Sequence, residues 1–388
     1  MSNSIHSDRM RTVQVSARRF ERSPFEGKWL GPDTVMGVYA GRYYSVFNGE
    51  DVENGYWTLR RKAVLYDVPE RPVEISGPDA ERFLEHTFSR RITTLKEGRG
   101  RYAIACDHRG HVFMDGVLFR LGHNRFWYVQ PDGALETWLL ANSAGFDITV
   151  TDPLSRVLQI QGPASLAIMS AATDGAITED MGYFHAGFFT IAGQRVYVSR
   201  TGWTGEMGYE VYTQGAATDC DRLWDRLMAV GQPHGMIFGS ISSMEMRRIE
   251  AGILDNGTDF DLTMTPFEAG LGRFVDLDKS DFIGRAALLT ADQQGKRLFG
   301  LKCRSGIPGY REVIMEGTRP VGHVTAGTWS PFLALGIGYV RFDVPGPWAG
   351  RELQVRTAEK GVLDCEIIDL PFYDPEKRIP RGLDRSAV

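Results

Sequence analysis

The feature that most constrains the fold is a run of short alternating segments in the C-terminal part of the chain. A polar hinge at residues 291–296 precedes the run. In each segment apolar and polar residues alternate, which is the period of a strand with one buried face. The segments are Leu298–Cys303, Val313–Glu316, Val321–Thr325, Gly338–Arg341, Leu353–Arg356 and Cys365–Ile368. Consecutive short strands predict a separate β-rich C-terminal domain with the character of a small barrel.

Upstream of the hinge, helical and strand periods are mixed, so the fold class we expect is α+β. Before residue 55 the chain is rich in turn formers and aromatic residues, and we expect a loop-rich leading segment there. Ser242 and Glu245 have the spacing of a capping box that opens a helix. The other expected elements are helices at Ala164–Ala172 and Asp221–Val230 and strands at Val112–Leu121 and Phe126–Gln130.

Composition excludes several classes of function. The chain has 388 residues, with 44 Lys and Arg against 49 Asp and Glu, a net charge of −5 that does not favour nucleic-acid binding. Its four cysteines are far apart and its histidines are scattered, so we expect reduced thiols, no metal site and a cytoplasmic protein. No apolar stretch is long enough to span a membrane. The Arg-rich first 22 residues are expected to form a solvated arm.

One glycine-rich segment, Arg200–Tyr212, is a candidate binding loop between two strands. Its glycines allow the backbone to approach a ligand closely, and Glu206 lies between two of them. The alternative is an ordinary hairpin whose glutamate is solvated, which is the usual state of a loop carboxylate.

Two further residues interrupt apolar patterns. Arg248 lies on the apolar face of its predicted helix, where it either serves a site or pairs with Glu245 one turn earlier. Asp115 interrupts an apolar strand just before Gly116, where it is either functional or a bulge residue. Neither pattern alone decides between these alternatives.

Together these features resemble the family of the glycine-cleavage T-protein, a tetrahydrofolate-dependent aminomethyltransferase. The resemblance covers most of the chain and is most specific in six segments. They are Arg200–Glu210, Arg248–Gly252, Pro266–Leu271, Lys279–Arg285, Val321–Pro331 and Pro371–Pro375. The resemblance implies three domains arranged as a clover leaf around a folate site. We therefore divide the chain into an N-terminal arm and leading segment (1–55), a folate-binding region of two intertwined domains (56–290) and the C-terminal barrel (297–380).

Within this family the chain is most similar to the dimethylsulfoniopropionate demethylase branch, at its opening Arg22–Phe25 and at Val73–Gly77. Residues 110–116 are also similar to tetrahydrofolate-dependent aryl O-demethylases. Glycine-cleavage enzymes carry two adjacent aspartates here, whereas this chain has Met114 and Asp115. The resemblance thus implies methyl transfer from a small S-, O- or N-methylated compound, foremost a dimethylsulfoniopropionate-like onium, to N5 of tetrahydrofolate. Aminomethyl transfer in a glycine-cleavage-type system and aryl O-demethylation are the alternatives.

The predicted site residues follow from this reading. The resemblance implies that Glu206 binds folate, and a carboxylate suits the adjacent N–H donors of a pterin edge. Arg248 would orient Glu206 or a ligand carboxylate, while Tyr102 and Trp203 would stack on the pterin or line the pocket. Asp115 would stabilise the positive charge that N5 gains during transfer. A sulfonium leaves as a neutral sulfide and needs no acid, which favours an onium donor over an aryl ether.

Overall fold

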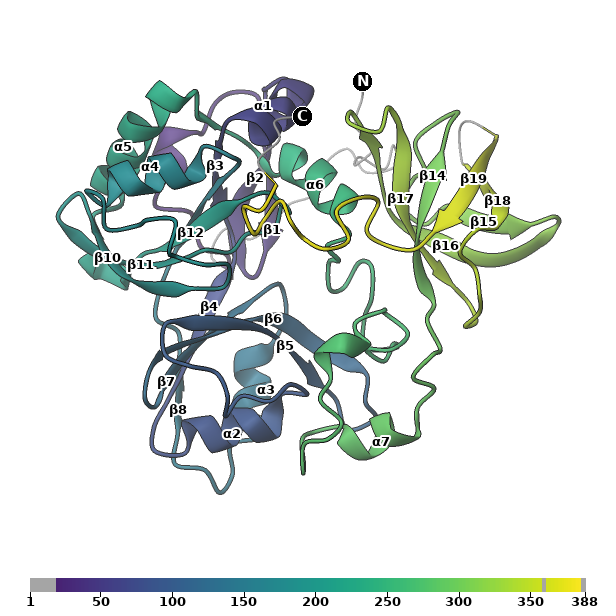
Figure 1. Cartoon of the computed structure of the whole chain (residues 1–388), viewed down its shortest axis with the longest axis horizontal. Coiled ribbons are helices and arrows are strands. Elements are labelled where there is room, and N and C mark those ends of the chain that lie inside the picture. Colours follow the sequence, from purple (N-terminus) through teal and green to yellow (C-terminus); the bar gives the residue numbers. More distant parts are fainter. Residues whose placement is uncertain (1–18, 358–360, 385–388) are drawn as a thin grey trace.

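The computed structural model describes residues 19–357 and 361–384, which form three parts around a centre (Figure 1). The fold is α+β, as the sequence predicts, and the C-terminal part is a closed barrel in the strand order β14-β17-β16-β15-β18-β19. Every segment predicted as a barrel strand is a strand. The bounds are β14 (Leu298–Cys303), β15 (Val313–Glu316), β16 (Arg319–Ser330), β17 (Leu335–Phe342), β18 (Glu352–Arg356) and β19 (Val362–Ile368).

A six-stranded sheet with two helices forms the second part. Its strand order is β10-β11-β12-β9-β3-β13. The strands are β3 (Val64–Val68), β9 (Val157–Gln161), β10 (Ala186–Ile191), β11 (Gln194–Ser199), β12 (Gly208–Tyr212) and β13 (Ile237–Phe238). Helix α5 (Cys220–Gly231) buries Leu223 and Leu227 in its core, and α4 (Ser165–Ala172) adds Ile168 and Met169. The glycine-rich segment therefore connects β11 to β12, as predicted.

A five-stranded sheet in the order β5-β6-β7-β4-β8 forms the third part. Its strands are β4 (Arg71–Ser76), β5 (Arg99–Cys106), β6 (Val112–Gly122), β7 (Arg125–Gln130) and β8 (Thr149–Thr151). Helices α2 (Ala80–Thr87) and α3 (Leu135–Ala141) lie on this part in Figure 1, and their apolar residues complete its core. Strands β6 and β7 confirm the strand pair predicted over residues 112–130.

Helix α6 (Ile241–Glu250) lies between the parts (Figure 1) and contacts α1 (Val52–Arg61), β2, β16 and β17. Its N-cap is Ser240 and not Ser242, so the predicted capping box is wrong by two residues. The Ser240 hydroxyl oxygen accepts from the Ser242 N–H, and the helix begins at Ile241. The leading segment also contains more structure than predicted, since β1 (Thr34–Tyr39) and β2 (Arg42–Asn48) form a hairpin.

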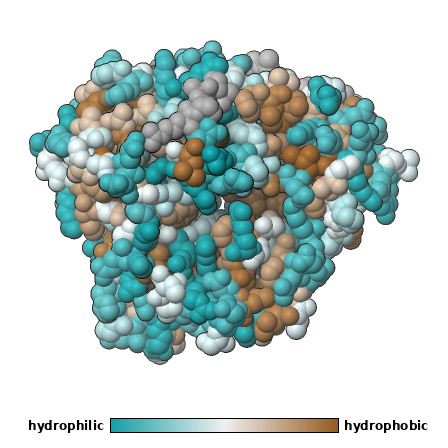
Figure 2. All heavy atoms as spheres, viewed as in Figure 1, coloured by the Kyte–Doolittle hydropathy of each residue, from teal (hydrophilic) through white to brown (hydrophobic). Residues whose placement is uncertain are grey.

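Short helix α7 (Arg285–Thr290) precedes the barrel. In the part of the chain that the structure describes, no helix is long and apolar enough to cross a membrane. The face seen in Figure 2 is mostly hydrophilic, with smaller apolar patches between the polar side chains. Most of the Arg-rich start falls outside the described residues. The division at residues 55, 290 and 297 remains a prediction.

Candidate active site

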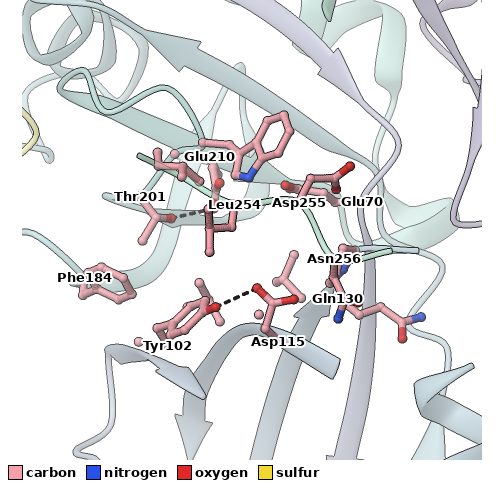
Figure 3. A pocket seen from close by; sticks show the side chains of 18 of the residues that line it. Glu70, Tyr102, Asp115, Gln130, Phe184, Thr201, Glu210, Leu254, Asp255 and Asn256 are labelled. Carbon is pink, nitrogen blue, oxygen red and sulfur yellow. Dashed lines mark hydrogen bonds between the residues drawn. The ribbon is translucent and has the colours of Figure 1, made fainter. Parts of the chain in front are cut away.

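A cavity of about 1030 Å³ lies where the parts meet. It is lined from β5 and β6, from the segment ending in β12, from the β1–β2 hairpin, from the loop after α6 and from the C-terminal segment. Figure 3 shows these side chains converging on one space from elements far apart in the sequence. A volume of this size is that of a site for a small organic ligand.

Asp115 lies on β6 and faces this cavity (Figure 3). It is 8% exposed, and its Oδ2 accepts a hydrogen bond of 2.7 Å from the Tyr102 hydroxyl. Its Oδ1 is buried without a hydrogen-bond partner among the described residues. Burial raises the pKa of Asp115, and the Tyr102 hydroxyl and then the nearby Asn256 amide oppose that shift. A buried carboxylate with one unused oxygen is suited to receive a positive charge or a proton from a ligand.

The residue after Asp115 is a glycine that the packing of the sheet requires. A Cβ on Gly116 would lie 2.3 Å from the carbonyl oxygen of Val129 on the neighbouring strand β7. No larger residue fits that approach, so Gly116 is required by the packing of β6 against β7. The alternative that Asp115 merely marks a bulge does not hold, because the register shift of β5–β6 falls at Ala105/Cys106.

Glu210, on β12, is the carboxylate of the glycine-rich segment that lines the cavity (Figure 3). Its Oε2 accepts hydrogen bonds from Thr201 at 2.5 Å, Ser199 at 3.1 Å and Tyr212 at 2.6 Å. Its Oε1 accepts one bond of 3.1 Å, from the Gln159 amide. Burial raises the pKa of Glu210. The side chain is therefore held rigidly by one oxygen, while the other keeps capacity for a ligand donor.

Glu206, in contrast, points away from the cavity into a buried ionic cluster. Its Oε1 lies 2.9 Å from Arg60 Nε and 2.7 Å from Arg247 Nε. Glu250 lies 3.6 Å from Arg60 and 3.9 Å from Arg247, and it also accepts from the Tyr56 and Tyr373 hydroxyls. This cluster joins α1, α6 and the C-terminal segment to the glycine-rich loop. The structure thus does not bring Glu206 together with Asp115.

Arg248 also lies outside the cavity lining. Its guanidinium pairs with Glu245 one turn earlier, and Nη1 lies 2.7 Å from Asp259. The same guanidinium lies 5.0 Å from the centre of the Trp203 ring, which does line the cavity. Arg248 therefore forms the ion pair with Glu245 that was the alternative in the sequence analysis. It also contacts the ring of Trp203 from outside the cavity lining.

Tyr102 and Trp203 both line the cavity, as predicted for the flat side chains. Tyr102 packs on Phe274 with ring centres 4.6 Å apart and donates to Asp115. Of the predicted site residues, then, the structure brings together Asp115, Tyr102 and Trp203. It adds Glu210, which the sequence reading passed over in favour of Glu206.

A cluster of arginines lines the side of the cavity near Phe274. Arg90 and Arg273 place their guanidinium carbons 5.3 and 4.7 Å from the Phe274 ring centre. Arg101 donates to the Thr94 hydroxyl at 2.8 Å. Burial lowers the pKa of Arg90, and the charges of Arg101 and Arg273 lower it further. Arg90 and Arg101 also donate to the backbone carbonyls of Tyr102 and Arg91. Within residues 19–357 and 361–384 none of the three guanidiniums forms an ion pair, so their charge suits an anionic ligand group.

The opposite side of the cavity is acidic and aromatic. Figure 3 places Glu70, Asp255, Asn256 and Gln130 there, away from Phe184. Burial raises the pKa of Asp255 to about 6. Sequence reasoning missed these residues, which come from three places: the turn between β3 and β4, the end of β7 and the loop after α6. The one signal available was that Glu70 lies two residues after the end of the mostly buried strand β3.

Comparisons with known proteins agree with this geometry. The family model of the GCVT N-terminal domain matches residues 33–279, and that of the Glycine cleavage T-protein C-terminal barrel domain matches residues 296–374. An aminomethyltransferase of Caldanaerobacter subterraneus is 30% identical over 335 residues, 84% of this chain and 88% of that protein. A trimethylamine-oxide aldolase of Ruegeria pomeroyi is 32% identical over 347 residues, 84% of this chain but 44% of that longer protein.

Among solved structures, the glycine cleavage system aminomethyltransferase T from Bartonella henselae matches with a TM-score of 0.82. It is 24% identical in sequence, and the match covers 91% of this chain and 98% of that one. This likeness shows that the two chains share the fold, including the terminal barrel.

The family models and the curated relatives show that the chain is a tetrahydrofolate-dependent one-carbon transferase. Within that class, the chain belongs to the glycine cleavage T-protein family, because the two family models together match most of its length. Tetrahydrofolate is the one-carbon acceptor of this family, and the chain is an enzyme of this kind.

The residues of the cavity fit tetrahydrofolate. The pterin edge presents N–H donors, and Glu210 Oε1 keeps acceptor capacity. The glutamate tail is anionic, and the unpaired arginines supply matching charge. Asp115 Oδ1 and Gln130 Oε1 are lining atoms without a hydrogen-bond partner in the described residues, as expected of groups that serve a ligand.

Proposed function

We propose that this enzyme moves a methyl group from a small S-, O- or N-methylated compound, foremost a sulfonium or ammonium, to N5 of tetrahydrofolate. The observation that carries the proposal is Asp115, a buried carboxylate with an unused oxygen in the middle of the cavity. It lies between the arginine side, suited to the folate tail, and the acidic side, suited to a cationic donor.

In this proposal folate is bound by Glu210, Tyr102 and the arginines of the cavity. Glu210 accepts from the pterin edge, and Arg90, Arg101 and Arg273 attract the glutamate tail. Tetrahydrofolate supplies the nucleophilic nitrogen. Glu206 and Arg248 act through other residues: Glu206 fixes the glycine-rich loop, and Arg248 supports Trp203.

The proposed role of Asp115 is electrostatic. As the carbon–nitrogen bond forms, N5 becomes positive, and a carboxylate held in place by Tyr102 stabilises that charge without rearranging. The proton that N5 then loses passes to Asp115 Oδ1 or to water. Holding the two reactants in one closed site supplies the rest of the rate enhancement by orientation, on the order of 7–11 kcal/mol in well-aligned cases.

Two observations favour methyl transfer from an onium. Met114 replaces the first of two aspartates that glycine-cleavage enzymes carry, and its side chain is buried among the apolar residues of its own sheet. An aryl ether needs a proton for its leaving oxygen, but burial and Asp115 raise the pKa of Tyr102 well above its usual value. The relative named a trimethylamine-oxide aldolase adds support for an N-methylated substrate.

Aminomethyl transfer is the second candidate, because several relatives are named aminomethyltransferases. Product analysis separates the two functions. Purified enzyme is incubated with tetrahydrofolate and ¹³C-methyl sulfonium or ammonium compounds, and the folates are resolved by mass spectrometry. Labelled 5-methyltetrahydrofolate is the expected product. Methylenetetrahydrofolate from an aminomethylated carrier, with no methyl transfer from any donor, would overturn the proposal in favour of the second candidate.

A further inference from the structure

The cavity is electrostatically polarised. Arg90 and Arg273 gather around Phe274, on which Tyr102 packs. Figure 3 places Tyr102 on one side of Asp115, and Asp255 and Glu70 on the other. The Tyr102 hydroxyl donates to Asp115, which therefore lies next to the arginine side. A folate whose tail occupies the arginine side leaves the acidic end for the second substrate.

The acidic end is built from an aspartate and two tyrosines of the β1–β2 hairpin. The Tyr39 hydroxyl donates to Asp255 Oδ1 at 3.3 Å, and Thr258 donates to Asp255 Oδ2 at 2.7 Å. The rings of Tyr39 and Tyr44 meet edge to face with centres 6.5 Å apart. All but Thr258 line the cavity. A fixed carboxylate beside aromatic rings is the environment that attracts an onium cation.

The arginine nearest in effect to Asp255 lies outside the cavity lining. Arg248 is the arginine whose charge acts on Asp255, but it is committed to Glu245, Asp259 and the Ile253 carbonyl. The remaining cationic lining residues lie toward the arginine side or are held by backbone. Lys377, for example, donates to the Ala251 carbonyl, and the charges of Arg247 and Arg273 help to lower its pKa.

In the described residues, no lysine or arginine of the cavity lining forms an ion pair or a hydrogen bond with Tyr39 or Asp255, whose side-chain partners are each other and Thr258. A zwitterionic donor such as dimethylsulfoniopropionate would bring its own carboxylate into an acidic end, where like charges repel.

We propose, resting on the proposed function, that the methyl donor is a small monocation without an acid group, seated against Tyr39, Tyr44 and Asp255. Its methyl–heteroatom bond breaks with the electron pair remaining on sulfur or nitrogen, so that a neutral sulfide or amine leaves. The methyl carbon bonds to N5, and the N5 proton is released. This departs from the zwitterionic donor that the sequence resemblance implies.

The test compares two cations that differ in one group. Dimethyl(propyl)sulfonium carries a methyl group where dimethylsulfoniopropionate carries its carboxylate. Each is titrated by calorimetry into enzyme saturated with 5-methyltetrahydrofolate, which fills the folate site and cannot accept a second methyl group at N5. We expect the propyl compound to bind at least about tenfold more tightly. Equal or tighter binding of the zwitterion, or no binding of either, overturns the inference.

Because this measurement involves no methyl transfer, it is independent of the proposed reaction. If the propyl compound binds more tightly but tetrahydrofolate gains no methyl group from it in a turnover assay, the proposed function fails while the cation site stands. If methyl transfer occurs preferentially from the zwitterion, the proposed function stands and the inference fails.

Variants locate the site. Asp255→Asn is expected to weaken dimethyl(propyl)sulfonium binding by about 10- to 100-fold, since a charged partner is lost. Asp281→Asn, an exposed aspartate paired with His86, serves as the matched control and leaves binding unchanged. Tyr39→Phe keeps the aromatic ring and is expected to keep most of the affinity for dimethyl(propyl)sulfonium. Tyr39→Leu removes the ring and is expected to lose that affinity. Equal binding by Asp255→Asn and wild type, with unchanged melting temperatures, contradicts the assignment.

Discussion

Replacing Glu210 by glutamine tests which carboxylate of the glycine-rich segment meets the folate. Glu210 Oε2 is occupied by three hydroxyl donors, and Oε1 is the oxygen with room for the pterin. Glutamine keeps one acceptor but loses the charge. A hydrogen bond to a charged group contributes about 1.5–3 kcal/mol, so the dissociation constant for tetrahydrofolate should rise roughly 10- to 150-fold.

Glu206→Gln is the matched control, because it makes the same chemical change outside the cavity lining, in the buried cluster of Arg60 and Arg247. Both guanidiniums lose their closest carboxylate and retain only Glu250 at 3.6 and 3.9 Å. Breaking one partner of a buried ion pair costs about 3–5 kcal/mol of folding free energy. The melting temperature should therefore fall by several degrees, while the folded protein binds folate within about threefold of wild type.

The assay is calorimetric titration with tetrahydrofolate at a temperature where both variants are folded, together with thermal melting. The account predicts that folate affinity responds to position 210 and stability to position 206. It is refuted if Glu206→Gln abolishes folate binding in a protein of normal stability while Glu210→Gln binds normally.

Three other predictions follow from the same geometry. Asp115→Asn should lower kcat by about 10²–10³-fold and change the affinity for folate by less than about threefold, measured by single-turnover kinetics. Equal losses of kcat and of folate affinity would mean that Asp115 only shapes the cavity. The pKa of Asp255 near 6 means that its carboxylate is charged above that pH, so KM for an onium donor should rise as pH falls through 6, and Asp255→Asn should flatten that rise. Gly116→Ala would place a Cβ 2.3 Å from the Val129 carbonyl oxygen and should destabilise the fold by about 1–3 kcal/mol. Gly122→Ala, which has open space around the added Cβ, should have the melting temperature of the wild type, and equal melting temperatures of the two variants would contradict the packing argument.

The barrel and the strand–loop–strand around residues 200–212 were predictable from the sequence because their patterns are local. A strand with one buried face shows alternating apolar and polar residues over a few positions. The glycines indicate that the backbone of the loop can approach another group closely. The same locality explains why Asp115 was recognised. It interrupts an apolar strand, and the structure shows its carboxylate in the cavity.

The choice between Glu206 and Glu210 could not be made in this way. Gly205 has a φ of +70°, so the chain reverses just before Glu206 and strand alternation does not apply to it. Glu210 lies on β12, and every residue of this strand is buried. The sequence therefore does not show which of its side chains face the cavity. The acidic end was equally hidden, because Tyr39 and Asp255 are 216 residues apart and meet only through the packing of the hairpin beside α6.

The most direct test of the central claim is the structure of the enzyme bound to 5-methyltetrahydrofolate. The account predicts that the pterin edge lies within hydrogen-bonding distance of Glu210, with N5 facing Asp115 and the glutamate tail toward Arg90 and Arg273. A folate bound outside this cavity, or one whose N5 points away from Asp115, would contradict it.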